Sequence, residues 1–417
     1  MDSFKQFNTR LEALQRNPSF FWISLIFLNI LLFLPQSLLS PSPVQWLPIP
    51  SVSGPRGWYD FILFFIRRPN QDFFRIVADY YFLLLILFFI IKYNRFLWIR
   101  HLITGLYIFM LIYHTYDTGM TLIFGESPIL YNDLMLVKGG FYLLVDIFFS
   151  SKIFAVLLLL LLYSGILLLI PFLFKGITLG FKNYQSSIKF QIASITLGII
   201  IILNNLWFTF YDFRPTIQWI VPKLTSNLQK SVQLKHYFDQ ATAQEPDSTY
   251  YQYEKIKLSN KPNVYIFMVE SYGRILLENS ESHPVYLDFM QEMQDSLEAE
   301  GWEARSSFSE APIFGGRSWL SMGSLICGIP IKDQVIYSYF INHQQNYPHL
   351  IHFFNQQGYR TFALQPLNRA RPGYSMSSYE NFYQYHTFIN AEDLDFDSPS
   401  FGFHKIPDQY SINYSHE

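Results

Sequence analysis

Residues 153–174 read IFAVLLLLLLYSGILLLIPFLF, twenty-two positions without a charged side chain. A helix that crosses the hydrocarbon core of a bilayer needs about 20 mainly apolar residues, so this stretch predicts a transmembrane helix. Four other stretches are similarly apolar and are long enough or nearly so: 20–39, 76–91, 97–124 and 190–210. The sequence therefore predicts a transmembrane region of five helices over residues 1–210.

The composition indicates two regions that face different solvents. Half of the 417 residues are hydrophobic and only 15% are charged, whereas a soluble domain carries about a quarter charged residues. Charged residues are sparse before residue 210, and their frequency returns to an ordinary level after it. The net charge of −2 gives no reason to expect a nucleic-acid partner. Cys327 is the single cysteine, which excludes an intrachain disulfide and a cysteine-based metal site.

Lysine and arginine predict the orientation, because basic residues accumulate in cytoplasmic segments. Three segments on one side of a five-span layout are basic: those before the first span, between the second and third, and between the fourth and fifth. Their basic residues are Lys5, Arg10, Arg16, Lys92, Arg95, Arg100, Lys175, Lys182 and Lys189. Arg67 and Arg68 oppose the pattern, but three segments outweigh one. We expect a multi-pass protein of the cell (inner or plasma) membrane, with a cytoplasmic N-terminus and an extracytoplasmic C-terminal domain.

Three parts of the membrane region admit other interpretations. The first span could be a cleaved signal peptide, but its apolar part exceeds the usual 7–15 residues and no A-x-A-like site follows it. Residues 131–149 mix apolar residues with Asp133, Lys138 and Asp146, which favours an interfacial helix over a sixth span. His114 and Asp117 lie one turn apart in the third span; a polar pair near the interface is favoured over a functional site.

The region after residue 210 begins with a polar connector and continues as an α/β pattern. Residues 211–260 are mixed in character and predict a partly helical connector. Residues 263–269 (NVYIFMV) are typical of a buried strand in a parallel sheet, and Glu270 follows at its carboxyl end.

Further strands and helices are expected to alternate after this strand. Helices are predicted at 285–299 and 349–357, ended by Gly301 and Gly358, and strands at 302–308 and 359–364. Such alternation is typical of an open, mostly parallel sheet. Ligands bind beyond the carboxyl ends of the strands in such sheets, which makes Glu270 a candidate site residue.

A second candidate lies in residues 311–330, APIFGGRSWLSMGSLICGIP. The Gly315-Gly316 pair predicts a loop, and a helix is expected from Ser318 to about Cys327, with Gly328 ending it. A serine hydroxyl at a helix N-terminus lies among unpaired amide groups that favour an anion, a suitable place to attack a phosphate or sulfate ester. From spacing alone, a capping role for Ser318 is favoured.

Together these motifs resemble the alkaline phosphatase/sulfatase superfamily, and most closely its membrane-anchored branch of lipoteichoic acid synthases and phosphoglycerol or phosphoethanolamine transferases. NVYIFMVESYG resembles the opening strand, whose terminal acid binds metal, here Glu270. GGRSWLSMGSLICGIP resembles the nucleophile segment, here with Ser318. HLIHFFNQQGYRTFALQP and FGFHKIPDQYS are similar to later segments of the family. The resemblance covers about residues 262–412 and the membrane layout.

The resemblance implies a metal-dependent phosphotransferase or hydrolase. A divalent cation (Mn²⁺, Zn²⁺ or Mg²⁺) held by Glu270 and the Ser318 hydroxyl would activate that serine as the nucleophile. The expected substrate is a head-group ester of a membrane lipid or a lipid-linked glycan. Arg317 could bind an ester oxygen; equally, it could be a solvated loop arginine.

Sulfate hydrolysis is a disfavoured alternative. Sulfatases oxidise a residue in a C/S-x-P-S-R motif, and this chain has Leu320 and Met322 where the proline and arginine would stand. The maturation signal is absent, so the sequence favours phosphate esters over sulfuric esters.

The chain departs from the family pattern at the second half of the metal site. The family completes this site with a later Asp-His pair, and no such dipeptide occurs within 261–417. His404, Asp408 and His416 stand in the wrong segment to replace it. We therefore expect an incomplete, truncated catalytic domain of about 157 residues, and the alternative function is an inactive membrane scaffold or binding protein.

Overall fold

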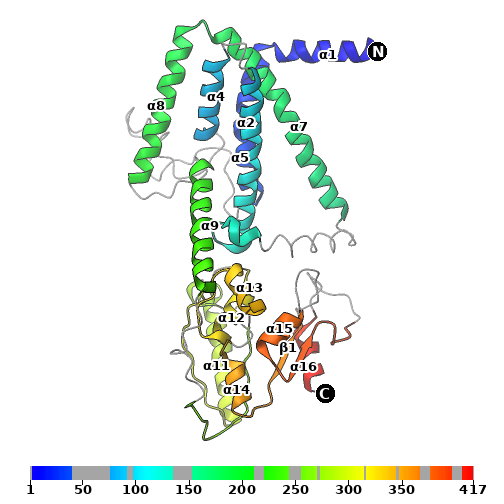
Figure 1. Cartoon of the computed structure of the whole chain (residues 1–417), viewed down its shortest axis with the longest axis vertical. Helices are drawn as coiled ribbons and strands as arrows, with labels where there is room; N and C mark the ends of the chain where they lie inside the picture. The colour runs from blue at the N-terminus through cyan, green and yellow to red at the C-terminus, as the bar shows by residue number, and fades with distance from the viewer. Residues whose placement is uncertain are drawn as a thin grey trace. The chain divides into compact units, whose positions relative to one another are not determined.

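The structure is a computed structural model in which the described residues are mostly helical and form one small parallel sheet (Figure 1). It describes residues 2–39, 76–91, 97–134, 153–210, 220–243, 255–269, 273–313, 316–343, 347–366, 376–396 and 406–416. The chain divides into two units, residues 1–131 with 143–235 and residues 132–142 with 236–417.

The described part of the first unit consists of helices and short connections. Its helices are α1 (Asp2–Gln15), α2 (Pro18–Leu39), α4 (Ala78–Ile90), α5 (Leu97–Phe124), α7 (Ile153–Tyr184), α8 (Ile188–Phe210) and α9 (Ile220–Ala243). Every stretch predicted as a span is helical in the structure. The fourth continues beyond residue 174 to Tyr184, and α9 confirms that the connector is partly helical.

Two of the described helices are long and apolar enough to cross a membrane, Pro18–Leu39 and Leu160–Tyr184. The apolar parts of α4 and α8 are shorter. Two candidate membrane helices are thus what the described residues show, and five spans stay a prediction.

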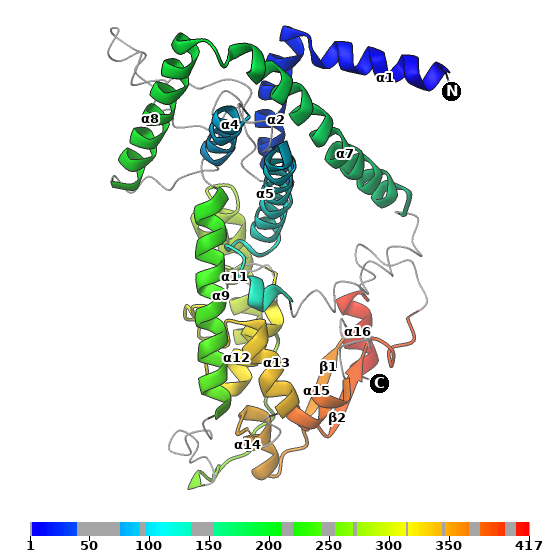
Figure 2. The same ribbon diagram turned by 45° about the horizontal axis from the view of Figure 1, so that its top comes forward.

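Helix α2 lies at the centre of the first unit and packs against both α5 and α7 (Figure 2). Gly176 and Gly180, four residues apart on α7, allow this close approach, because a Cβ at either position would overlap the ring of Phe20 or Phe21. From α5, the buried Tyr107 hydroxyl donates to the Leu28 carbonyl at 2.6 Å. The unit therefore has a tightly packed interior.

The outward faces of these helices are also apolar. Leu168 is 78% exposed and Ile23 is 61% exposed. Other exposed apolar residues lie on α2, α5, α7 and α8: Ile26, Phe27, Leu102, Leu106, Phe109, Phe154, Leu161, Ile192, Ile195 and Ile199. Soluble monomers rarely expose apolar surface on this scale, so these faces require an apolar surrounding or partner.

The second unit contains the sheet. Its helices are α10 (Ile275–Glu278), α11 (His283–Ala299), α12 (Ser318–Cys327), α13 (Gln334–His343), α14 (Leu350–Gln356), α15 (Met376–Tyr383) and α16 (Asp408–His416). Strands β1 (Phe362–Gln365) and β2 (Thr387–Asn390) pair in parallel, with Ala363 opposite Phe388. The core lies between α12, α13, α14 and α15 around Leu320, Tyr379 and Tyr383.

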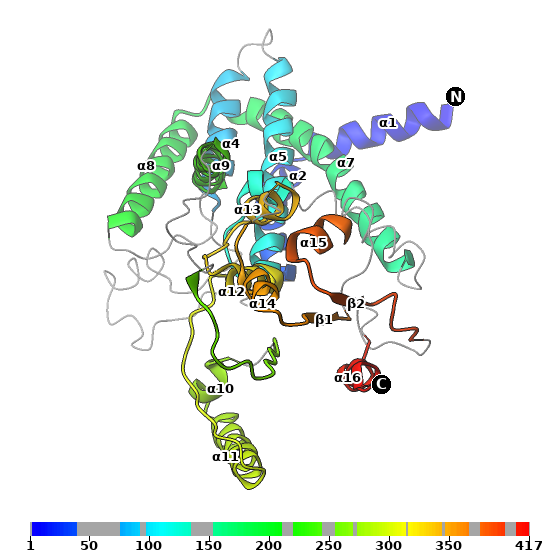
Figure 3. The same ribbon diagram turned by 60° about the horizontal axis from the view of Figure 1, so that its bottom comes forward.

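Two of the predicted strands do not form in this structure. Residues 263–269 and 302–308 belong to no strand, and their side chains are mostly exposed, as at Phe267 and Phe308 (each 74%). The predicted helix between them is confirmed as α11, but it buries no residue, and Figure 3 shows it standing clear of α12 and α14. The physical reason is that a strand exists only through hydrogen bonds to a neighbour, and the described residues supply none here.

Candidate functional site

Helix α12 places Ser318 at its first position. Its bounds, Ser318 to Cys327, are those predicted from the sequence, and Gly328 ends it with φ of 69°. Arg317, not Ser318, is the N-cap residue, so the capping role favoured for Ser318 is wrong. The Ser318 side chain is exposed. Ser318 therefore belongs to the first turn of a helix, the end at which an anion is stabilised.

The rest of α12 is fixed by its contacts with the following segment. Ser324 Oγ donates to the Leu320 carbonyl at 2.7 Å and accepts from the Ile331 N–H at 2.8 Å. Trp319 Nε1 donates to Gln334 Oε1 at 2.8 Å. At Gly323 the helix approaches α13 so closely that a Cβ would lie 2.9 Å from Tyr337. These contacts fix α12 against the segment that follows it, and the Trp319 contact lies directly beside Ser318 in the chain.

The carboxyl end of β1 faces the same helix. Gln365 Nε2 lies 3.9 Å from the sulfur of Met322, and Tyr379 donates to Gln365 Oε1 at 2.9 Å. Met322 is one turn beyond Ser318, so the two side chains share a face of α12. Because β1 and β2 are parallel, both carboxyl ends lie at this edge of the sheet. The arrangement agrees with the rule that ligands bind beyond the carboxyl ends of parallel strands.

Arg317 is buried, with only 7% of its surface exposed. The interpretation of Arg317 as a solvated loop arginine is therefore wrong. A buried guanidinium is paired with acceptors or an anion, and Arg317 directly precedes Ser318 in the chain. Its role as an ester-binding residue stays a prediction.

The metal-binding half of the predicted site is outside what the structure describes. Glu270 falls outside the described residues, as does His404. Asp408 opens α16 and is not brought to Ser318 by any described contact. Across the described ranges, no group of three or more His, Cys, Asp or Glu side chains could hold a metal ion. Of the two predicted metal ligands, Glu270 and Ser318, the structure therefore describes only Ser318.

Histidines that the sequence gave no reason to single out support the sheet. His349 caps α14 by accepting the His352 N–H at its Nδ1 (3.2 Å), and its Nε2 donates to the Phe382 carbonyl (2.8 Å). Burial lowers the pKa of His349 from 6.5 to about 4, so the ring is neutral. Near the start of β2, His386 Nδ1 accepts the Thr361 N–H at 3.1 Å. Both histidines have structural roles. For His349, the one signal in the sequence was its place directly before the start of α14 at Leu350.

The His114–Asp117 pair belongs to the first unit. His114 is 1% exposed, and within the described ranges neither ring nitrogen has a hydrogen-bond partner. Asp117 Oδ2 accepts from Lys223 Nζ of α9 at 2.7 Å. The sequence could not indicate this ion pair, because its partners stand 106 positions apart. This ion pair joins α5 to α9, so the role of Asp117 is structural.

Comparison with known proteins adds no further constraint on this site. No family model, no curated protein and no solved structure matches the chain.

Proposed function

We propose that the chain is a membrane-bound, metal-dependent phosphotransferase or hydrolase that acts on head-group esters of envelope lipids or lipid-linked glycans through Ser318. The observation that carries the proposal is the placement of Ser318: it is exposed at the start of α12, directly after the buried Arg317, and one turn before Met322, which contacts Gln365 at the carboxyl end of β1. An ester phosphate at this place would meet a nucleophile, helix N–H groups and a guanidinium together.

The exposed apolar faces of α2, α5, α7 and α8 support a membrane location. Lipid would cover these faces at no hydrophobic cost, whereas water would not. The proposed topology has five spans, a cytoplasmic N-terminus and the catalytic residues outside the membrane. The basic segments that flank the helices support this orientation.

The proposal needs Glu270 to reach Ser318, and the contacts of Gln357 provide a route. Gln357 accepts the Leu258 N–H at 3.0 Å and donates to the Ile256 carbonyl at 2.8 Å. These two bonds hold the chain that leads into residues 263–269 beside the chain that leads into β1. The two segments therefore start together and can run side by side.

In the proposed active arrangement, residues 263–269 pair in parallel with the edge of β1 that faces away from β2. Within the described residues, β1 pairs with β2 alone, so this edge can accept a strand. Pairing would bury the apolar residues now exposed and carry Glu270 to the edge of the sheet where Gln365 meets α12. A divalent cation could then join Glu270 to Ser318, lowering the pKa of the hydroxyl and neutralising the ester.

The test uses the full chain in lipid nanodiscs that contain phosphatidylglycerol with a fluorescent acyl chain, with Mn²⁺ supplied. The expected product is labelled diacylglycerol. Ser318→Ala should reduce its formation by about 1,000-fold or more, because the nucleophile is lost. Ser321→Ala changes another serine of the same helix and should retain activity within about twofold. Chelation of the metal should abolish turnover, and added Mn²⁺ should restore it.

Equal activity in the Ser318→Ala and Ser321→Ala proteins would refute the nucleophile assignment. The inactive scaffold would be favoured by two results together: no protein, including the wild type, is active, and calorimetry detects no Mn²⁺ binding. Release of sulfate from a sulfate ester, without turnover of phosphate esters, would favour the sulfuric ester alternative.

A further inference from the structure

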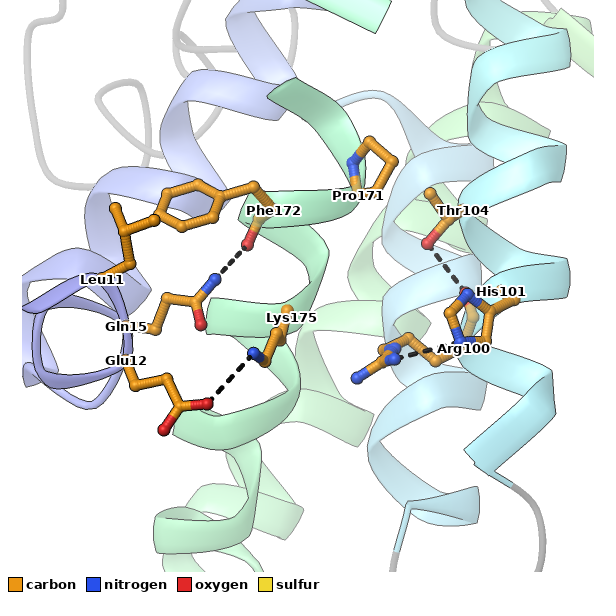
Figure 4. Close-up of a pocket in the computed structure, with 9 residues that line it drawn as sticks. All are labelled: Leu11, Glu12, Gln15, Arg100, His101, Thr104, Pro171, Phe172 and Lys175. Carbon is orange, nitrogen blue, oxygen red and sulfur yellow. Dashed lines mark hydrogen bonds and ion pairs between the residues drawn. The ribbon is translucent and has the colours of Figure 1, made fainter. Parts of the chain in front are cut away.

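A second polar site lies in the first unit, at the end of the bundle where α1, α5 and α7 meet. A cavity of about 450 Å³ opens there, and it is lined by both charged and apolar side chains (Figure 4). Arg100 and His101 come from the first two turns of α5, and Lys175 comes from α7. Glu12 and Gln15 come from the last turn of α1. Basic groups from two helices thus face carboxylate and amide groups from a third.

Gln15 is buried, with 2% of its surface exposed, yet half of its amide is unsatisfied. Its Nε2 donates to the Phe172 carbonyl at 3.2 Å, which fixes the orientation of the amide. Its Oε1 has no hydrogen-bond partner among the described residues. A buried acceptor without a partner costs about 1–3 kcal/mol. The cavity therefore suits a ligand that donates a hydrogen bond to this oxygen.

The cations of the cavity are poorly matched by its one carboxylate. Lys175 Nζ lies 3.8 Å from Glu12 Oε1, a loose contact between two half-exposed side chains. Arg100 donates to Nε2 of His101 at 3.0 Å. A guanidinium pairs most strongly with a carboxylate or a phosphate, through two parallel hydrogen bonds. A phosphate between Arg100 and Lys175 would satisfy both cations.

The apolar surroundings indicate where the phosphate comes from. The cavity is also lined by Leu11, Pro171 and Phe172, and Lys175 stands within the apolar helix Leu160–Tyr184. Basic pockets between transmembrane helices on the cytoplasmic side bind anionic lipid head groups. In the topology proposed above, the cavity lies at the cytoplasmic leaflet.

We propose that this cavity binds the head group of an anionic phospholipid that carries a hydroxyl, such as phosphatidylglycerol. The lipid phosphate would bind Arg100 and Lys175, and a head-group hydroxyl would donate to Gln15 Oε1. The proposal rests on the membrane topology and not on catalysis by Ser318.

The test measures lipid retention by native mass spectrometry on the full chain in detergent, in a Ser318→Ala background so that no lipid is consumed. The protein is titrated with dioctanoyl phosphatidylglycerol, dioctanoyl phosphatidylcholine and glycerol 3-phosphate. Phosphatidylglycerol should bind at least about tenfold more tightly than either of the others. Arg100→Gln and Lys175→Gln should each weaken it about tenfold, because each removes one charged hydrogen-bonding partner of the phosphate. Gln15→Leu should weaken it by several-fold.

The matched control is Lys182→Gln, which removes an exposed lysine of the same helix outside the cavity. It should leave phosphatidylglycerol binding within twofold of the parent. Equal loss in Lys182→Gln and Lys175→Gln would overturn the site and indicate attraction to basic charge in general. Glycerol 3-phosphate binding as tight as the lipid would overturn the lipid assignment. Because every protein in the test lacks Ser318, failure here leaves the catalytic proposal untouched, and success does not support it.

Discussion

Gln365, the last residue of β1, lies with its amide nitrogen 3.9 Å from the sulfur of Met322, one helical turn beyond Ser318. This contact brings the carboxyl edge of the sheet to the first turns of α12. The site proposed here depends on it, because residues that follow a strand added to β1 would arrive at the same edge.

Thiol cross-linking tests whether residues 263–269 pair with β1. A cysteine at Ala363 is combined in turn with one at Val264, Tyr265, Ile266 or Phe267 in the full chain. Because side chains alternate between the two faces of a strand, we expect a short bifunctional maleimide to cross-link one alternate pair of positions well and the other poorly. Mass spectrometry of the tryptic peptides measures the yield. Uniformly low yields would contradict strand pairing, and cross-links only between two chains would indicate exchange between copies.

Cys327 should not interfere with that experiment. Its thiol is buried at the end of α12, and burial raises its pKa to about 12. The thiolate that reacts with thiol reagents is therefore scarce at neutral pH. We expect the folded wild type to react with Ellman's reagent at least about 100-fold more slowly than the urea-unfolded chain, as measured by absorbance. Rapid labelling of the folded protein would contradict the burial of α12.

The stability of the second unit should depend on pH through His349. Its pKa is about 4 in the folded state and 6.5 when unfolded, so the unfolded chain binds more protons between these values. The contribution of His349 to the free energy of unfolding is then fully present above pH 6.5. It falls by up to about 1.4 kcal/mol per pH unit as the pH drops toward 4.

Urea unfolding of the His349→Asn protein measures this contribution. Asparagine can still cap α14 but does not titrate, so the free energy of unfolding should fall less between pH 6.5 and 4. The control His343→Asn replaces an exposed histidine of α13 and should keep the wild-type profile. An identical slope in all three proteins would contradict the buried neutral histidine.

Gly323→Ala tests the packing that fixes α12. The added Cβ would lie 2.9 Å from the Tyr337 ring, and overpacking of this kind costs about 1–3 kcal/mol. Urea unfolding should show that loss, and catalytic turnover should fall with it because Ser318 shifts. Gly273→Ala places a Cβ where nothing lies within 4 Å and should be nearly neutral. Comparable destabilisation by both substitutions would show that the close approach to Tyr337 carries no special cost.

Local signals in the sequence predicted the helices well. The bounds of α12 were predicted from Ser318 and Gly328, and the third span has the bounds of α5, Leu97–Phe124. Gly301 and Gly358 both adopt the positive φ expected of residues that end helices. These features depend on neighbours within one or two turns, so a short window of sequence contains them.

Strands and the site depended on distant partners and were predicted less well. Only part of the predicted strand 359–364 is confirmed, as β1, whereas 263–269 is unpaired. Strand β2 has four residues and no flanking signal. The position of Ser318 at the start of a helix was predicted. The burial of Arg317 was not, because it depends on how α12 packs in three dimensions.

The most direct test of the central claim is the covalent intermediate on Ser318. The full chain in nanodiscs is mixed with phosphatidylglycerol and Mn²⁺, quenched in acid within milliseconds to seconds, and digested with trypsin. Cleavage after Arg317 and Lys332 releases residues 318–332 as one peptide. We predict a phosphoglycerol adduct on Ser318 in the wild type and in Ser321→Ala, and none in Ser318→Ala. Turnover without any adduct on this peptide, or with an adduct that persists in Ser318→Ala, would contradict the account.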